Sequence, residues 1–487
     1  MNSCLACQRG KRKCDRAQPS CSTCVRVGKV CVYAGGEASI ALTRDAERSS
    51  AARPLPKLLP SKASSTAKAL LDPPARFDPF QQIASRQATV HASLAAEAQR
   101  LIGPHEAIVR VVDAYFDTIH KQIPIISSHK LRSQVRLIEN TETPSEVTAL
   151  CLCMHLVQQV PTPSAESMTT GLYISVKSLI TLIQATECRS LEFIQCMVLV
   201  AYYEMGHGVL VATGMTVAAC SRLARDIGLH KFQEPTSTMH ESQNSEERRR
   251  VWWALLILDR YTSFCRGDSF YSTPDMNMSS HIPIEDELWD RNIVPSLPPH
   301  LLSTPCSPNT GTFARECQVI HFLGSVIRHV FEPSTDPIFQ IEEAHQLENA
   351  LMAFMPLMPL VLEEQDFDKY GVALSICASA LFTLYTQSDQ IGVQKKLEDL
   401  ALGMTHYMQN AWQDLATVQV TFLSPYIIHC VYECAVVLGR LDNEDAKDQA
   451  LWLKELLGVF HRRWIVAGTY LGALNSERPS LIWFLSK

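Results

Sequence analysis

The sequence predicts an all-helical protein in which a small cysteine module with two short helices and a flexible linker precede a large multi-helix body. Three observations support this fold class. Six of the 17 cysteines lie within residues 4–31, and six prolines lie between residues 54 and 79. Beyond about residue 100, apolar residues recur at spacings of three and four, which is typical of helices, and no segment alternates convincingly as a strand would.

Length and composition indicate a folded chain with an uneven distribution of charge. The 487 residues are too many for one compact core, and a hydrophobic share of 46% excludes wholesale disorder. The formal net charge is −6, but residues 1–36 hold seven basic side chains and one acid, so they carry +6 and the remaining 451 residues carry −12. A small cationic head is therefore joined to a mildly acidic body.

The sequence favours a soluble, intracellular chain without a membrane partner. No signal-peptide pattern opens it, and its longest uninterrupted apolar stretch, residues 350–362, has 13 residues and two prolines. A membrane span needs about 17–20 residues. Because thiols stay reduced inside cells, we expect the ordered cysteine cluster to bind metal rather than to form disulfides.

The head cysteines repeat one half-motif twice, a Cys-x2-Cys followed by a third cysteine seven residues on: Cys4, Cys7, Cys14, Cys21, Cys24 and Cys31. Tetrahedral zinc needs four ligands and prefers sulfur in closed structural sites. Two ions require eight ligand positions, so six thiols suffice if two sulfurs bridge both metals. About 30 residues cannot fold unaided, so metal binding must supply the folding free energy. One zinc with two spare cysteines, or a three-disulfide knot, are the alternatives.

Basic residues lie between and after these cysteines. Residues 8–13 hold four cations in six positions, and a short helix there would present Arg9 and Lys11 at its N-terminal end. Guanine offers two acceptors, O6 and N7, in the major groove, which suit arginine or lysine. The other cations would contact phosphates, which fixes position without reading sequence: Arg12, Lys13, Arg16, Arg26 and Lys29. A solvated face or a nuclear-import signal is the alternative interpretation.

Residues 4–31 resemble the fungal binuclear zinc cluster DNA-binding family, with matches over residues 4–15 and 18–24. The resemblance implies two Zn²⁺ ions, with Cys4 and Cys21 as bridges. It places Cys7 and Cys14 on one ion, and Cys24 and Cys31 on the other. Pro19 matches the family's loop proline. The resemblance also implies recognition of a CGG-type triplet with Lys11 as the main base reader, although Gly10 stands where the family commonly has a second cation.

Residues 37–100 are predicted to be a linker rich in proline and serine. Near its end, Ile83 and Val90, and again Leu94 and Leu101, are seven residues apart, but polar residues interrupt the seam. A coiled coil needs three or four sustained heptads, so we expect an ordinary amphipathic helix instead. Whether the protein binds DNA as a homodimer is left open.

Residues 101–487 are predicted to form the helical body, with an irregular, proline-rich loop at about 289–312. Helices are expected over 104–120, with Pro104 in the first turn, and over 191–203 and 209–229, the last closing at Gly228. Another should open with a capping box of Asn244 and Glu247. It runs through eight consecutive apolar residues, 251–258, and should therefore be central.

The body carries a second resemblance. Residues 115–125, 222–230 and 248–261 are similar to the fungal-specific transcription factor domain, the middle homology region. This resemblance implies an all-helical regulatory module without a recognised catalytic activity. The chain also has no GxxxxGK[ST], GxGxxG or HExxH pattern, so it is not expected to be an enzyme.

Other chemistry-bearing residues of the body have structural interpretations. Cys151 and His155 share a helix face, but two ligands do not close a metal site, and core packing is favoured. His207, between two glycines, is expected in a turn or in packing. The basic run 248–250 is expected to make caps and salt bridges. Segments 362–368 and 441–445 mix acids with apolar residues; solvated loops are favoured over recruitment of transcription machinery.

Together these features predict a nuclear, sequence-specific DNA-binding regulator of RNA polymerase II transcription, with a metabolic or secondary-metabolite gene cluster as the candidate target. A zinc-containing enzyme, or a corepressor that uses the cluster for protein contacts, are the alternatives. Target genes, the direction of regulation and the effector of the body are left open.

Overall fold

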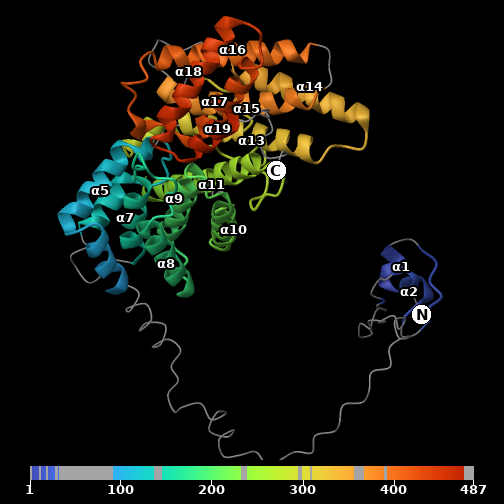
Figure 1. The fold of residues 1–487 in the computed structure, drawn as a ribbon. Helices are drawn as coiled ribbons and strands as arrows, with labels where there is room; N and C mark the ends of the chain where they lie inside the picture. Colours follow the sequence, from blue (N-terminus) through green and yellow to red (C-terminus); the bar gives the residue numbers. More distant parts are fainter. Residues whose placement is uncertain are drawn as a thin grey trace, which may run out of the picture. The chain divides into compact units, whose positions relative to one another are not determined.

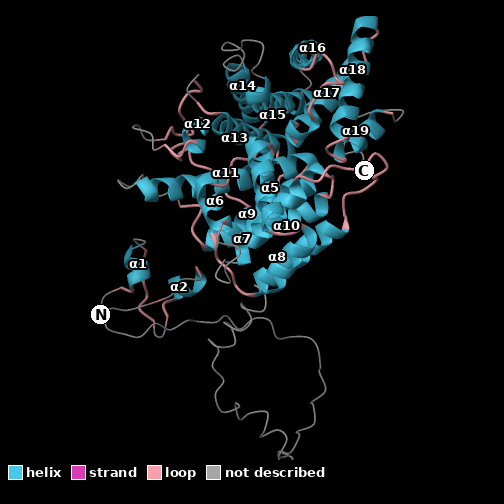
Figure 2. Cartoon of the chain, turned by 90° about the vertical axis from the view of Figure 1, so that its left-hand side faces the viewer, coloured by secondary structure: helices cyan, strands magenta, loops and turns pink. Residues whose placement is uncertain are grey.

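The computed structural model describes residues 3–9, 12–17, 20–27, 31, 92–136, 145–231, 239–293, 299–307, 310–355, 367–388 and 392–475. The chain divides into two compact units, Met1–Phe77 and Asp78–Lys487. The described residues form helices and loops and no strand, with only isolated bridges such as that between His281 and Leu301 (Figure 2). The predicted fold class is therefore confirmed. The predicted domain limits at residues 36 and 100 stay predictions.

The head contains two helices of five residues each, α1 (Leu5–Arg9) and α2 (Ser22–Arg26). They contact each other and enclose a small core made almost entirely of cysteine sulfur. Such a core buries too little apolar surface to hold the head together by itself.

The first half of the body follows a short helical stretch over residues 92–101, whose Leu94 and Ala98 are buried in the body's core. This agrees with an ordinary amphipathic helix; Ile83 and Val90 lie outside the described residues. The helices of this half are α5 (His105–Asp117), η1 (Ile119–Lys121), α6 (Ser128–Val135), α7 (Ser145–Val157), α8 (Gly171–Ala185), α9 (Leu191–Gly206), α10 (Leu210–Asp226) and α11 (Met239–Arg266).

The second half begins with α12 (Asp286–Asp290), after which the described residues before 312 form no helix, where the sequence predicts an irregular loop. Figure 1 shows this half, yellow to red, stacked beside the first. Its remaining helices are α13 (Thr312–Phe331), α14 (Pro337–Phe354), α15 (Phe367–Thr386), α16 (Val393–Ala411), η4 (Val420–Phe422), η5 (Pro425–Ile427), α17 (Ile428–Leu438), α18 (Glu444–His461) and α19 (Val466–Leu474). Among the described residues, no helix is both long and apolar enough to cross a membrane.

Helix α11 is central to the body, as its unbroken apolar run predicts. It packs against α9, α10 and α13, so it joins the two halves (Figure 1). All eight residues from Val251 to Leu258 are buried. The indole N–H of Trp253 donates to the carbonyl of His281 at 3.0 Å, which satisfies the polar atom of a fully buried ring.

The predicted start of α11 is wrong. The helix begins at Met239, so Asn244 and Glu247 lie inside it and form no capping box. The Glu247 carboxylate instead accepts the backbone N–H of Ser127, the N-cap of α6, at 3.1 Å, and pairs with Lys130 at 3.2 Å. The Glu247 carboxylate therefore binds at the start of α6, although the sequence pattern assigns it to the start of α11.

The other predicted helices appear with small shifts at their ends. Pro104 lies one residue earlier than expected, as the N-cap of α5. Gly228 follows α10 with a φ of +75°, the left-handed conformation that favours glycine at a helix end. In segment 441–445 the first three residues form a loop, as predicted, and the last two begin α18, which Asn443 caps by accepting the backbone N–H of Asp445. Residues 362–366 lie outside the described residues.

His207 follows the last turn of α9 and is a packing residue, as the sequence indicates. Its ring lies 4.3 Å from that of Tyr203 and 5.2 Å from that of Trp464, measured between centroids. Gly206 is required beside it, since a Cβ there would lie 2.3 Å from Cε3 of the buried Trp464. Burial and the nearby Arg463 lower the pKa of His207 to about 3.

We expect His207 to make the body less stable at acid pH. Because its pKa falls from 6.5 to about 3 on folding, only the unfolded chain takes up this proton between those values. Stability is therefore complete above pH 6.5 and is lost as the pH falls, by about 2 kcal/mol at pH 5. The measurement is urea unfolding of wild type and His207→Phe at pH 7.5 and pH 5. Equal losses in both proteins would contradict the assignment.

Candidate metal centre and nucleic-acid interface

The two halves of the head present their cysteines in the same way. Cys4 precedes α1 and Cys7 lies within it, while Cys21 is the N-cap of α2 and Cys24 lies within that helix. Backbone N–H groups point at both leading sulfurs: that of Cys7 at Cys4 Sγ and that of Cys24 at Cys21 Sγ, each at 3.4 Å. Each Cys-x2-Cys turn thus holds two sulfurs at one helix start.

The structure brings all six head cysteines into two overlapping groups. Cys4, Cys7, Cys14 and Cys21 form one group, and Cys4, Cys21, Cys24 and Cys31 form the other, with every sulfur of a group within 4.8 Å of the rest. Cys4 and Cys21 belong to both and lie 3.8 Å apart. These are the two cysteines that the family resemblance implies as bridges.

The spacing of the sulfurs fits zinc. A Zn–S bond of about 2.3 Å gives a tetrahedron whose sulfurs are about 3.8 Å apart. Within the groups, the sulfurs of Cys4 and Cys24 lie 3.5 Å apart, those of Cys7 and Cys21 3.6 Å, and those of Cys4 and Cys21 3.8 Å. A disulfide would need about 2.05 Å, and the cysteines are free thiols.

The electrostatics of the sulfurs also favour a bound cation. Burial and the thiols of Cys4 and Cys21 raise the pKa of Cys7 to about 12. Burial and the neighbouring sulfurs raise the pKa of Cys24 as well. Six thiolates this close together repel one another, so without metal the thiols keep their protons. A divalent cation neutralises the thiolate charge and displaces these protons. The alternatives of a single zinc ion and of a disulfide knot find no support in this geometry.

Asp15 ties the two halves together, and the sequence argument missed this role. Its carboxylate accepts the backbone N–H of Ser22 at 3.1 Å and also the Ser22 hydroxyl. The hydrogen bond from the Ser22 hydroxyl is the main reason that the pKa of Asp15 is lowered. Thr23 adds a second link, since its hydroxyl donates to the carbonyl of Lys13 at 2.9 Å. The isolated acid among seven cations was the available signal.

The predicted DNA-contacting residues are only partly described. Arg12, Lys13, Arg16 and Arg26 are exposed, so their charges are available to a polyanion. Arg16 has a φ of +60°, which turns the chain sharply after Cys14. The side chain of Arg9, and all of Lys11 and Lys29, lie outside the described residues.

The basic run of α11 serves the body. Arg248 donates to the carbonyl of Ile227 at 2.8 Å, and Arg249 pairs with Glu246. Arg250 is fully buried and pairs with Glu246 at 2.9 Å. The predicted use of this run in salt bridges is confirmed, but the predicted caps are wrong, because the run lies inside α11 rather than in its first turn. Cys151 is likewise buried in α7, as core packing predicts.

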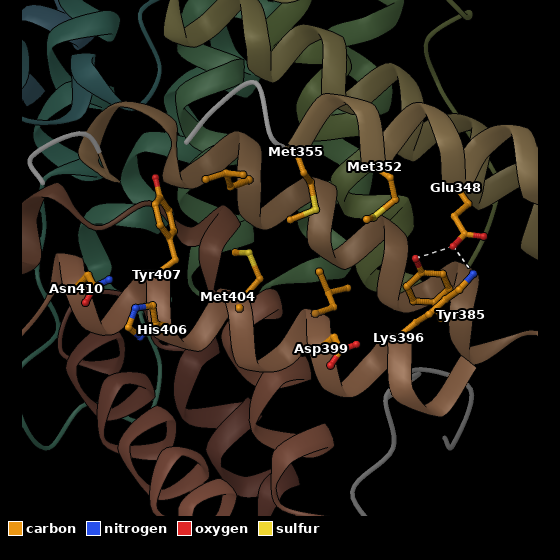
Figure 3. A pocket seen from close by; sticks show the side chains of 13 residues that line it. Glu348, Met352, Met355, Tyr385, Lys396, Asp399, Met404, His406, Tyr407 and Asn410 are labelled. Atoms are coloured by element: carbon orange, nitrogen blue, oxygen red, sulfur yellow. Dashed lines mark hydrogen bonds and ion pairs between the residues drawn. The ribbon is translucent and has the colours of Figure 1, made fainter. Parts of the chain in front are cut away.

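A cavity of about 580 Å³ lies among α14, α15 and α16 (Figure 3). The thioethers of Met352, Met355 and Met404 give it a soft apolar wall. At its polar end, Glu348 accepts the Tyr385 hydroxyl at 2.9 Å and pairs with Lys396 at 2.5 Å. These polar groups are already satisfied by one another.

The head can bind two metal ions and exposes basic side chains, and the same chain carries a large helical body. These features define the class of metal-dependent DNA-binding regulators. The comparisons with known proteins agree. The family model of the fungal Zn(2)-Cys(6) binuclear cluster domain matches residues 2–36, and that of the fungal specific transcription factor domain matches residues 112–353.

Two curated relatives bear names of the same kind. Transcription factor BOA15 of Botryotinia fuckeliana is 31% identical over 140 residues, which are 28% of this chain and 76% of the relative. Oleate activated transcription factor 3 of Kluyveromyces lactis is 60% identical over 30 residues, which are 6% of this chain and 5% of the relative. The chain belongs to the fungal zinc cluster transcription factors.

This membership establishes the coarse function. The chain is a DNA-binding transcription factor whose cysteine cluster binds two zinc ions. The family argues against an enzyme and implies action in the nucleus. The assignment of each cysteine to an ion, and of each cation to DNA, stays a prediction.

Proposed function

We propose that the head reads CGG-type triplets in the promoters of a metabolic or secondary-metabolite gene cluster transcribed by RNA polymerase II. In this proposal Cys4 and Cys21 bridge the two zinc ions, and the other four cysteines complete the two sites. Lys11, with Arg9, reads base edges, and the remaining cations hold phosphates. Residues 1–36 form the DNA-binding domain and residues 37–100 the linker. Residues 101–487 form the regulatory domain, which contacts the transcription machinery.

The observation that carries this proposal is the pair of four-sulfur groups sharing Cys4 and Cys21. Six thiolates and two Zn²⁺ ions give the cluster a charge of −2, so a loaded head with +6 on its side chains stays near +4. The exposed Arg12, Lys13 and Arg26 are part of this charge. A positive surface fixed in shape by metal is suited to a duplex.

Selection of bound sequences from a random duplex pool by the zinc-loaded full-length protein tests the proposal. We expect enrichment of CGG-type triplets, singly or as a pair whose spacing reports a dimer. The affinity should fall with salt, with a slope of log K against log salt of about 0.9 per neutralised phosphate. Stripping the zinc with a chelator should abolish the enrichment. A pool that stays random with zinc bound would favour a corepressor that uses the cluster for protein contacts.

We expect Lys11→Ala and Arg26→Ala to weaken binding in different ways. Lys11→Ala should cost about 1–3 kcal/mol on the selected site and relax base preference, because it removes a contact to base edges. Arg26→Ala should weaken all sequences evenly and reduce the salt slope by about one, because it removes a phosphate contact. Fluorescence anisotropy on selected and scrambled duplexes separates the two. Identical behaviour of both variants would refute this division of labour.

A further inference from the structure

A second cavity of the body, of about 940 Å³, lies between α13, the end of α16 and the loop that follows it. Polar side chains and aromatic rings share its wall, unlike the apolar cavity among α14, α15 and α16. The chemistry of the wall is set by Lys121, Glu316, Asn410, Trp412, Asp414 and Phe422.

Glu316, in the second turn of α13, is the unusual member of this wall. Its side chain is buried, with a relative exposure of 5% for the residue. Among the described residues, no group hydrogen-bonds or ion-pairs with its carboxyl. Burial and the nearby Asp286 carboxylate raise the pKa of Glu316 well above its ordinary value. The Glu316 oxygens are not fully shut off from solvent, so they are open to the cavity, where a molecule bound inside it can contact them.

The cations near Glu316 do not pair with it. Arg250 is used by other groups: its Nη1 lies 2.8 Å from Asp286 Oδ1, and the guanidinium also binds Glu246 and the carbonyl of Ile284. Lys121 lies in the cavity wall, but its Nζ sits over the Phe422 ring, 5.1 Å from the centroid. The missing partner of Glu316 can therefore come from a molecule inside the cavity.

We propose that this cavity binds a small organic cation whose ammonium group pairs with Glu316. On binding, the carboxyl gives its proton to solvent and the carboxylate accepts the ligand's N–H. Trp412 offers aromatic surface, which suits an ammonium and its carbon chain. Asp414 adds a second acid to the wall, and the Asn410 amide can bind further polar groups.

A metal ion is not the proposed occupant. Among the described residues, the groups that could hold a metal both lie in the head, and Glu316 belongs to neither. Two carboxylates from Glu316 and Asp414 leave too few hard ligands for calcium or magnesium. The proposal concerns the body alone, so it stands or falls separately from the DNA sites of the head.

Isothermal titration calorimetry on the zinc-loaded full-length protein tests it with three amines, namely tyramine, agmatine and spermidine. Tyrosol, which replaces the ammonium of tyramine with a hydroxyl, is the neutral control. We expect at least one amine to bind with a Kd below about 1 mM, and Glu316→Gln to weaken that binding at least tenfold, the effect of losing a charged hydrogen bond. Glu342→Gln, on the exposed face of α14, should leave it unchanged.

A second variant separates binding from folding. Ala411→Phe places a ring in the cavity and leaves Glu316 in place, so it should also weaken binding while far-UV circular dichroism stays that of wild type. Failure of all three amines to bind would overturn the proposal. Equal binding by wild type and Glu316→Gln, or by tyramine and tyrosol where tyramine is the amine that binds, would overturn it as well.

Discussion

Replacing Cys21 with alanine is expected to empty both metal sites at once and to abolish sequence-specific DNA binding. Cys21 belongs to both four-sulfur groups, so its loss leaves each with three ligands. It also caps α2 by accepting the N–H of Cys24 at 3.4 Å. Since metal binding supplies the folding free energy of so small a module, the head should unfold. Bound zinc should fall from two ions per chain to none, and specific affinity should fall by about 10³-fold or more.

Two further cysteine variants make this result specific. Cys31 belongs to one group only, so Cys31→Ala should retain an ion at the other group. Cys306 is buried in the body, outside both groups, so Cys306→Ala should keep two ions and full affinity. Zinc is measured on dialysed full-length protein by elemental analysis, and affinity by anisotropy on the selected duplex. If Cys21→Ala held as much zinc as Cys31→Ala, the bridging role of Cys21 would be wrong.

That six head cysteines can hold two metals by sharing two sulfurs was predictable from counting ligands, whereas the choice of Cys4 and Cys21 as bridges came from the family resemblance. Each Cys-x2-Cys turn fixes two sulfurs locally, and the shortage of thiols requires sharing. The tie between the halves was not accessible. Asp15 contacts Ser22, seven residues away in the other half of the head, and no local spacing pattern predicts this contact.

The helices of the body were predictable where one face, or the whole circumference, is apolar, as in α5, α9 and α11. Their ends were less so, because capping is decided by tertiary contacts. Glu247 serves Ser127, 120 residues earlier in the chain, rather than the start of its own helix. Sequence periodicity also could not single out Glu316. It shows that a polar residue lies on the buried face of a helix, but not whether that residue has a hydrogen-bond partner there.

The buried guanidinium of Arg250 is expected to contribute strongly to the stability of the body. It is fully buried, and its N–H groups donate to Glu246 at 2.9 Å, to Asp286 at 2.8 Å and to the carbonyl of Ile284 at 2.8 Å. These contacts fasten α11 to α12 and to the segment before it. The guanidinium also lies over the Trp289 ring, 5.1 Å from its centroid. The pattern is a core ion network rather than a DNA contact.

Arg250→Ala should lower the free energy of unfolding of the body by about 3–5 kcal/mol, because it leaves the Asp286 carboxylate without its cation and leaves Glu246 paired with Arg249 alone. Arg291→Ala is the matched control, since the Arg291–Glu287 pair is exposed, with 66% and 64% of the two side chains accessible, and should cost under about 1 kcal/mol. Arg250→Lys keeps the charge but cannot reach all three partners, so an intermediate loss is expected. Urea unfolding followed by circular dichroism at 222 nm gives the values. Equal costs for Arg250→Ala and Arg291→Ala would show that the buried network does not hold the two halves of the body together.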